Sequence, residues 1–167
     1  MSSGHRDDLE WSWVFRYHED TAMTHEYEGR YREKHAQGTA PDPALARQVK
    51  DRARKGRLSC AAAFAIAKDT GASPSEVGRT ADLLETKITR CQLGLFGHST
   101  EQRNVVEPLA EVSTELEQAL RTGTVNGKLP CREAWDIASR WRVSKQEITA
   151  ACQRLEIRIG PCQLGVF

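Results

Sequence analysis

The sequence predicts a mostly α-helical protein made of two tandem three-helix modules behind a helical N-terminal extension. Three observations lead to this prediction. One segment recurs at a constant offset of 71 residues, apolar residues within it repeat at helical spacing, and each copy contains a serine-to-glutamate helix-start signal. Because a module of this size has little core of its own, we expect the modules to pack together or to gain a leading helix.

The repeat covers about 41 residues without a gap. It begins at Gly56-Arg-Leu-Ser-Cys60, which aligns with Gly127-Lys-Leu-Pro-Cys131, and it closes with Cys91-Gln-Leu-Gly-Leu-Phe96 and Cys162-Gln-Leu-Gly-Val-Phe167. An uninterrupted match of this length indicates a duplicated domain. Aligned pairs between these ends include Ala63 and Ala134, Phe64 and Trp135, Ile66 and Ile137, Val77 and Ile148, and Leu84 and Leu155.

The sequence divides the chain into three regions. Residues 1–40 form an aromatic and charged extension that we expect to be helical, residues 41–97 form the first module, and residues 98–167 form the second module with its leading amphipathic helix. The first boundary follows from Gly38-Thr-Ala-Pro-Asp-Pro43, since two prolines and a glycine interrupt regular structure there.

The elements of the first module follow from its sequence in order. A leading helix is expected over residues 43–55, and a helix over residues 59–68, where apolar residues recur at helical spacing. Gly71 breaks that helix. Ser73-Pro-Ser-Glu76 then opens the next one with a capping box, in which the serine oxygen accepts from a free amide and the glutamate reaches back. Pro74 fits the first helical position.

The second module repeats this scheme. Its helices are expected over residues 104–120, over residues 130–140 and from the capping box Ser144-Lys-Gln-Glu147 onward. After the last helix of each module, residues 86–90 and 157–159 have high strand propensity and could form a short strand or a β wing.

The string Ile66-Ala-x-x-x-Gly-Ala-Ser-x-x-x-Val77 resembles the helix-turn-helix pattern, with a small residue at the helix contact, a turn glycine, a cap and a β-branched core residue. The second copy keeps Ile137, Ala138 and Ile148 but has Arg142 where the pattern has glycine. The resemblance covers about half of the chain and implies tandem helix-turn-helix modules. Such modules also serve as protein-protein adaptors, so it specifies fold better than function.

The resemblance implies a DNA-binding protein, a transcriptional regulator whose second helix in each module enters the major groove of double-stranded DNA. Lysine and arginine side chains suit guanine or phosphate, and glutamine suits adenine. The residues expected to contact DNA are Arg142, Lys145, Gln146, Thr149, Gln153 and Arg154 in the second module, and Ser75 and Arg79 in the first. Residues 127–167 hold seven Lys/Arg against four Asp/Glu, so this prediction places the basic excess on the second module.

The alternative is a non-catalytic adaptor or accessory subunit of a larger assembly. The formal net charge of the whole chain is only +1, and the first module offers a poorer groove face than the second. Four aromatic residues gathered near the N-terminus would then bind the protein partner: Trp11, Trp13, Phe15 and Tyr17.

Four of the five cysteines occupy equivalent repeat positions, Cys60 with Cys131 and Cys91 with Cys162. We interpret them as buried packing residues. Ligation of zinc or an iron-sulfur cluster is an alternative that only folding could enable, because no Cys-x-x-Cys is present. A third interpretation is a redox switch, because a helix start beside Cys60 and Cys131 would lower the thiol pKa. We expect no cofactor.

Several function classes lack their usual signals. The sequence has no glycine-rich phosphate loop, nucleophile elbow or evident acid–base pair, so we expect no enzyme. It also has neither a secretory signal at its start nor an apolar stretch of spanning length, so we expect a cytoplasmic protein without a membrane partner.

Overall fold

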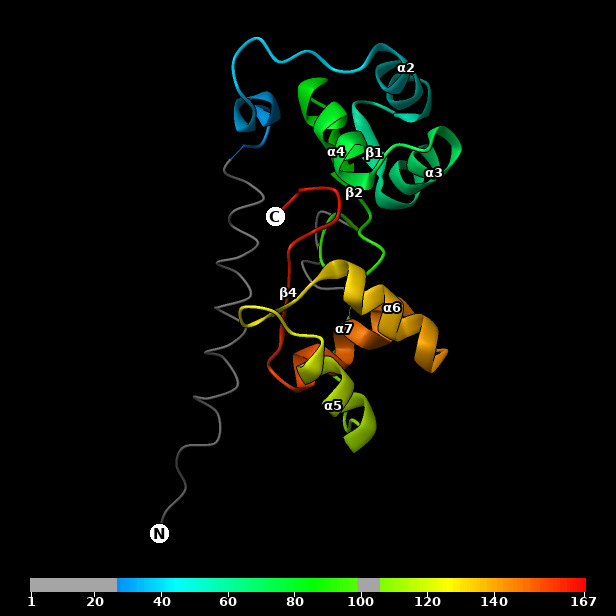
Figure 1. Cartoon of the computed structure of the whole chain (residues 1–167), viewed down its shortest axis with the longest axis vertical. Helices are drawn as coiled ribbons and strands as arrows, with labels where there is room; N and C mark the ends of the chain where they lie inside the picture. Colours follow the sequence, from blue (N-terminus) through cyan, green and yellow to red (C-terminus); the bar gives the residue numbers. More distant parts are fainter. Residues whose placement is uncertain (1–26, 99–105) are drawn as a thin grey trace.

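The computed structural model describes residues 27–98 and 106–167, and in these residues the fold is mostly helical, as predicted. The predicted aromatic cluster from Trp11 to Tyr17 lies outside the described residues. Figure 1 shows two lobes, one made of the elements up to β2 and the other of the elements from α5 onward. We call residues 43–97 the first unit and residues 114–167 the second unit.

The two units contain the same elements in the same order. The first has α2 (Pro43–Arg52), β1 (Arg57–Ser59), α3 (Cys60–Thr70), α4 (Pro74–Leu83) and β2 (Lys87–Thr89). The second has α5 (Thr114–Thr122), β3 (Lys128–Leu129), α6 (Cys131–Trp141), α7 (Lys145–Arg154) and β4 (Arg158–Ile159). Every element of the second unit begins 71 residues after its counterpart, so the repeat extends back to the leading helices α2 and α5.

Both predicted capping boxes are present. The Ser73 hydroxyl oxygen accepts from the Glu76 amide at 3.2 Å, and the Ser144 hydroxyl oxygen accepts from the Glu147 amide at 3.1 Å. Each glutamate in turn accepts from its serine amide at 2.7 Å. These bonds satisfy helix-start amides that have no intrahelical partner, which fixes where α4 and α7 begin.

The strand-prone stretches form strands but not wings. β1 pairs with β2 in parallel, with Leu58 opposite Ile88, and β3 pairs with β4 in parallel, with Leu129 opposite Ile159. Each strand pair therefore joins the residues just before the second helix of its unit to the residues just after the third helix. The buried side chains at these positions belong to the core of their own unit.

Two predicted helices differ from the structure. Of the helix expected over residues 104–120, the described residues 106–113 are not helical, and α5 begins only after its N-cap Ser113. Pro108 has no amide to donate, and the Leu109 amide instead donates to the carbonyl of Ala150 in α7 at 3.2 Å. In the N-terminal extension, which we expected to be helical, residues 27–40 contain one short 3₁₀ helix, η1 (Tyr31–Lys34), and no α-helix, while the rest of the extension lies outside the described residues.

The core of each unit includes a segment of the other unit. We call Cys91–Phe96 tail 1 and Cys162–Phe167 tail 2. Cys91, Leu93 and Leu95 of tail 1 are buried in the core of the second unit, while Leu164 of tail 2 is buried in the core of the first. Figure 1 shows this exchange: the red C-terminal segment runs from β4 up to the lobe that contains α4, and the green segment after β2 passes toward α6 and α7.

Candidate functional site

The two tails cover the helices that the sequence assigned to DNA reading. The Thr149 hydroxyl in α7 donates to the Leu93 carbonyl of tail 1 at 2.7 Å. Gly78 holds the equivalent position in α4, and there the Leu164 carbonyl of tail 2 lies so close that a Cβ on Gly78 would be 1.9 Å from its oxygen. Both contacts join the same helix position to the same tail position, so the units cover each other reciprocally.

Aromatic contacts also join equivalent positions. The ring centroids of Phe64 and Trp135 are 4.4 Å apart, and those of Phe96 and Phe167 are 5.9 Å apart in an edge-to-face arrangement. Contacts between equivalent residues are expected where two copies are related by a two-fold axis, as in a symmetric dimer. The two units therefore pack as an internal dimer within one chain.

This packing corrects the predicted DNA contacts of α7. We expected Thr149 and Gln153 to face outward, but both are buried. Lys145 is half-buried, because its ammonium lies 3.6 Å from the centroid of the Trp135 ring and donates to the Gln92 side chain at 2.7 Å. Thr149 and Lys145 thus bond to tail 1 of the first unit, whereas Gln153 is buried. The periodicity of α7 could not reveal this, because the face opposite its own core is covered by a segment from the other unit.

Five of the predicted contact residues remain exposed on the surface. They are Ser75 and Arg79 on α4, Arg142 before α7, and Gln146 and Arg154 on α7. Gln146 borders tail 1, since a Cβ on Gly94 would be 3.6 Å from its side chain. The predicted set is thus divided between the surface and the contact between the units.

The strongest concentration of positive charge lies at a site that the sequence analysis missed. Six basic residues accompany a single acidic one, Asp51, between the second half of α2 and the start of β1: Arg47, Lys50, Arg52, Arg54, Lys55 and Arg57. We call this stretch, residues 47–57, the basic turn. All six are exposed except Arg52, which is half-buried. A charge count over a short window would have found it.

The basic turn reverses the predicted charge asymmetry. With the bounds that the helices set, the first unit holds ten Lys/Arg against five Asp/Glu, and the second unit holds eight against six. In the sequence, the first repeat was taken to begin at Gly56, so its charge count excluded the cations of α2. The first unit, not the second, carries the larger basic excess.

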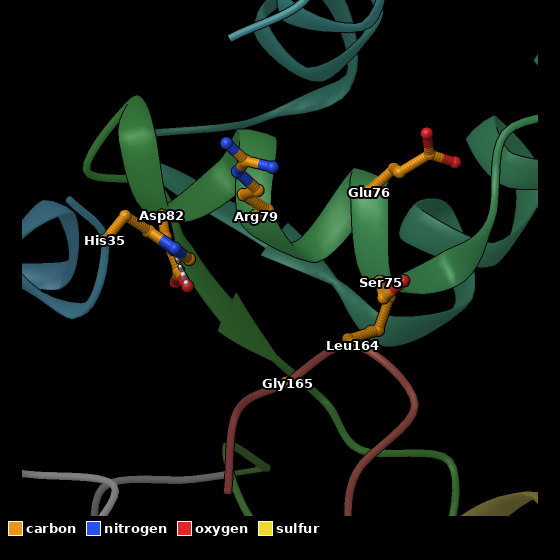
Figure 2. A pocket seen from close by; sticks show the side chains of 7 residues that line it. All are labelled: His35, Ser75, Glu76, Arg79, Asp82, Leu164 and Gly165. Atoms are coloured by element: carbon orange, nitrogen blue, oxygen red, sulfur yellow. Dashed lines mark hydrogen bonds and ion pairs between the residues drawn. The ribbon is translucent and has the colours of Figure 1, made fainter. Parts of the chain in front are cut away.

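A shallow hollow lies where η1, α4 and tail 2 meet, with a volume of about 320 Å³. Figure 2 shows its lining, in which His35 and Asp82 interact across one side while Glu76 points away from them. The Asp82 carboxylate receives Lys34 at 2.8 Å and His35 at 3.0 Å. Ser73 holds the pKa of Glu76 below its usual value by backbone and side-chain hydrogen bonds. Both carboxylates therefore have structural partners.

The repeated cysteines are packing residues in this structure. Burial raises the pKa of Cys60, that of Cys91 to about 12 and that of Cys162 to about 11, so these thiols are protonated at neutral pH. This burial opposes the lowered pKa of Cys60 that the redox-switch interpretation needs. Among residues 27–98 and 106–167, no group of three or more His, Cys, Asp or Glu side chains is arranged to hold a metal ion.

None of the described helices has the length and the apolar character needed to cross a membrane. The chain was compared with protein-family models, with curated proteins and with solved structures, and no significant match was found to any of them.

Proposed function

We propose that the protein binds double-stranded DNA as a pair of helix-turn-helix-like units and acts as a transcriptional regulator. The observation that carries the proposal is the charge of the folded units. Both are net positive, by five charges in the first and two in the second, although the whole chain has a net charge of only +1. Positive charge on a folded surface attracts the phosphate backbone, which supplies most of the affinity of non-specific DNA binding.

The surface of the described residues offers little for a purely apolar docking site. Among the described residues, the exposed large hydrophobic side chains are Val125, at 59% exposure, and Trp141, at 37%. The Arg140 guanidinium lies 5.6 Å from the centroid of the Trp141 ring and partly covers it. Protein interfaces need an apolar, fully buried centre, and these two side chains are too few to supply one.

The way in which the protein contacts DNA differs from the sequence prediction. Thr149 cannot reach a base edge while its hydroxyl donates to the Leu93 carbonyl of tail 1, and the Gln153 side chain is buried. The exposed residues Arg142, Gln146 and Arg154 can still meet DNA at the ends of α7. We therefore propose binding that is dominated by phosphate contacts, which position a protein on the duplex without reading sequence.

The test is a titration of the whole chain into labelled random-sequence duplex DNA, followed by fluorescence anisotropy. We expect a Kd on the order of 10⁻⁴ to 10⁻⁶ M at physiological salt, and a linear fall of log affinity with log salt concentration. No binding at about 50 mM salt would contradict the proposal, because phosphate contacts are strongest there.

A second candidate is a non-catalytic adaptor or accessory subunit. It is favoured by the contacts of α4 with tail 2 and of α7 with tail 1, because these contacts use the helices expected to bind DNA for packing within the protein. The same titration separates the two functions, because an adaptor would leave the anisotropy of the duplex unchanged at every salt concentration.

A further inference from the structure

We propose that the basic turn is the principal phosphate-contacting surface of the protein, and that the first unit therefore dominates DNA binding. This inference rests on the proposed function, because it names the surface through which that function operates.

The turn is a rigid platform. Arg54 donates from Nη1 to the carbonyl oxygens of Asp51 at 2.8 Å and Ala53 at 2.9 Å, which closes the end of α2. The Arg54 and Arg57 backbones exchange hydrogen bonds at 2.8 and 3.0 Å, and Lys55 between them has a left-handed φ of 51°. Because these hydrogen bonds hold the backbone of the turn, binding a phosphate backbone has to order its cationic side chains but not the chain that carries them.

The free cations are three. Within the described residues, the side chains of Lys50, Lys55 and Arg57 make no ion pair or hydrogen bond, and all three are exposed. Arg52 differs, since its guanidinium donates to the Asp69 carboxylate at 2.6 Å. Arg47 is 83% exposed, and its contact with Asp51 at 4.0 Å is long for an ion pair, so it can join the set.

The partner that suits this surface is a regular polyanion. A DNA duplex presents about one negative charge per 1.7 Å of its axis, so closely spaced cations can each replace a condensed counterion. An acidic protein would need an apolar centre beside the charges. The basic turn offers none, because its large apolar side chain, Val49, is fully enclosed in the core of the first unit.

The second unit lacks this surface at the equivalent positions. Lys50, Lys55 and Arg57 correspond to Arg121, Asn126 and Lys128. The Arg121 guanidinium donates to the Glu117 carboxylate at 2.8 Å, and Val125 stands where Arg54 does. The repeat therefore supplies a control with the same backbone and fewer free charges.

The experiment compares two double variants of the whole chain in the anisotropy titration. Lys50→Gln with Arg57→Gln removes two charges from the basic turn, and Arg121→Gln with Lys128→Gln removes two from the same positions of the second unit. Each lost phosphate contact should make the salt slope shallower by about 0.9 and weaken binding on the order of tenfold near 0.1 M salt. We expect both effects for the first variant and less than a twofold change in Kd for the second.

Lys55→Asn is a third variant, which copies the residue of the second unit at Asn126. Asparagine tolerates the left-handed conformation of this position, so the turn should keep its shape while losing one charge. It should make the slope shallower by about half as much as the first double variant. Circular dichroism and the melting temperature of each variant verify that folding is unchanged.

The outcomes separate this inference from the proposed function. If the unmodified chain does not bind DNA at low salt, the proposed function fails and this inference fails with it. If the chain binds and the two double variants weaken binding equally, the inference is wrong while DNA binding stands. The inference is also wrong, while DNA binding stands, if only the second-unit variant weakens binding.

Discussion

The two tails occupy equivalent places on the two units but are held in different ways. Tail 1 buries Cys91, Leu93 and Leu95 against the second unit, and its Leu93 carbonyl accepts from the Thr149 hydroxyl. Tail 2 buries Leu164 in the core of the first unit, Cys162 and Val166 pack partly buried against it, and Gly165 is exposed. On α4 the tail lies directly on the Cα of Gly78, with no side chain between them. After duplication, one contact uses a hydrogen bond and the other uses close backbone approach.

Each tail is also covered from outside by a different segment. Val106 lies over tail 1, since a Cβ on Gly94 would be 2.5 Å from Val106 Cγ2. Tail 2 instead receives Lys34 of η1, whose ammonium donates to the Gly165 carbonyl at 3.2 Å and also pairs with Asp82 at 2.8 Å. Tail 1 is therefore covered by an apolar side chain, whereas tail 2 is held at its edge by polar contacts of Lys34, which pairs with Asp82 in a mostly buried position, at 21% and 10% side-chain exposure.

The largest effect is expected from Gly78→Ala. An alanine in a helix interior is ordinarily more stable than a glycine by roughly 0.5–1 kcal/mol. Here the added Cβ would meet the Leu164 carbonyl oxygen at 1.9 Å and must displace tail 2. We expect the free energy of unfolding in urea to fall by about 2–3 kcal/mol, as in overpacked cores. The sign decides the matter, since a stabilised variant would show that the close approach of tail 2 is unnecessary.

Thr149→Val is the matched change on α7, because it keeps the shape of the side chain and removes the hydroxyl that donates to Leu93. It leaves a carbonyl in a buried position with one partner fewer, at a cost of about 1–2 kcal/mol. Together the two variants test whether the tails are held as differently as their contacts indicate. An equal decrease in the free energy of unfolding for the two variants would contradict that difference.

Local signals in the sequence predicted local structure well. The capping boxes at Ser73 and Ser144 were predicted because serine and glutamate at this spacing satisfy the same amides wherever they occur. The burial of Thr149 was not predicted, because it depends on a carbonyl 56 residues away in the other unit. Helical periodicity shows that a face is polar, but a hydroxyl that bonds a distant backbone is also polar. The basic turn was missed for another reason, since the repeat was taken to begin only at Gly56.

A second test concerns the buried thiols, which differ between the units at one position. Cys152 of α7 stands where α4 has Ala81, and burial raises its pKa to about 12. A thiol whose pKa is higher in the folded protein than its ordinary value of 9.0 contributes its full stabilisation below pH 9. Above pH 9 such a thiol loses its proton in the unfolded chain but keeps it in the folded protein. The free energy of unfolding therefore falls by about 1.4 kcal/mol per pH unit for each such thiol.

We therefore expect the free energy of unfolding to fall between pH 9 and pH 10.5, and Cys152→Ala to make that fall shallower. The alanine also copies the first unit at Ala81, so the α7 core should accept it with a modest cavity cost. Urea titrations of both proteins at each pH measure the two slopes. Identical slopes would mean that Cys152 is not desolvated as its position in the core requires.

The smallest effect is expected at the turn between the second and third helices of each unit. Gly71 and Arg142 hold equivalent positions, and both are left-handed, with φ of 75° and 56°. The shape of the turn is therefore kept in the second unit although its residue is not glycine. This left-handed conformation costs an L-residue other than glycine roughly 1–2 kcal/mol. Glycine avoids that cost but loses more conformational entropy on folding, so the net difference in stability is smaller.

Arg142→Gly should consequently stabilise the protein by up to about 1 kcal/mol, and Gly71→Arg should destabilise it by a similar amount. Since Arg142 is exposed, the arginine has no core contact to lose in the exchange. If Arg142→Gly also weakens DNA binding in the titration, the strained arginine contributes to function at a cost in stability. If stability rises and binding stays the same, the basic turn of the first unit suffices, and the second unit serves chiefly to hold α4 and its tail in place.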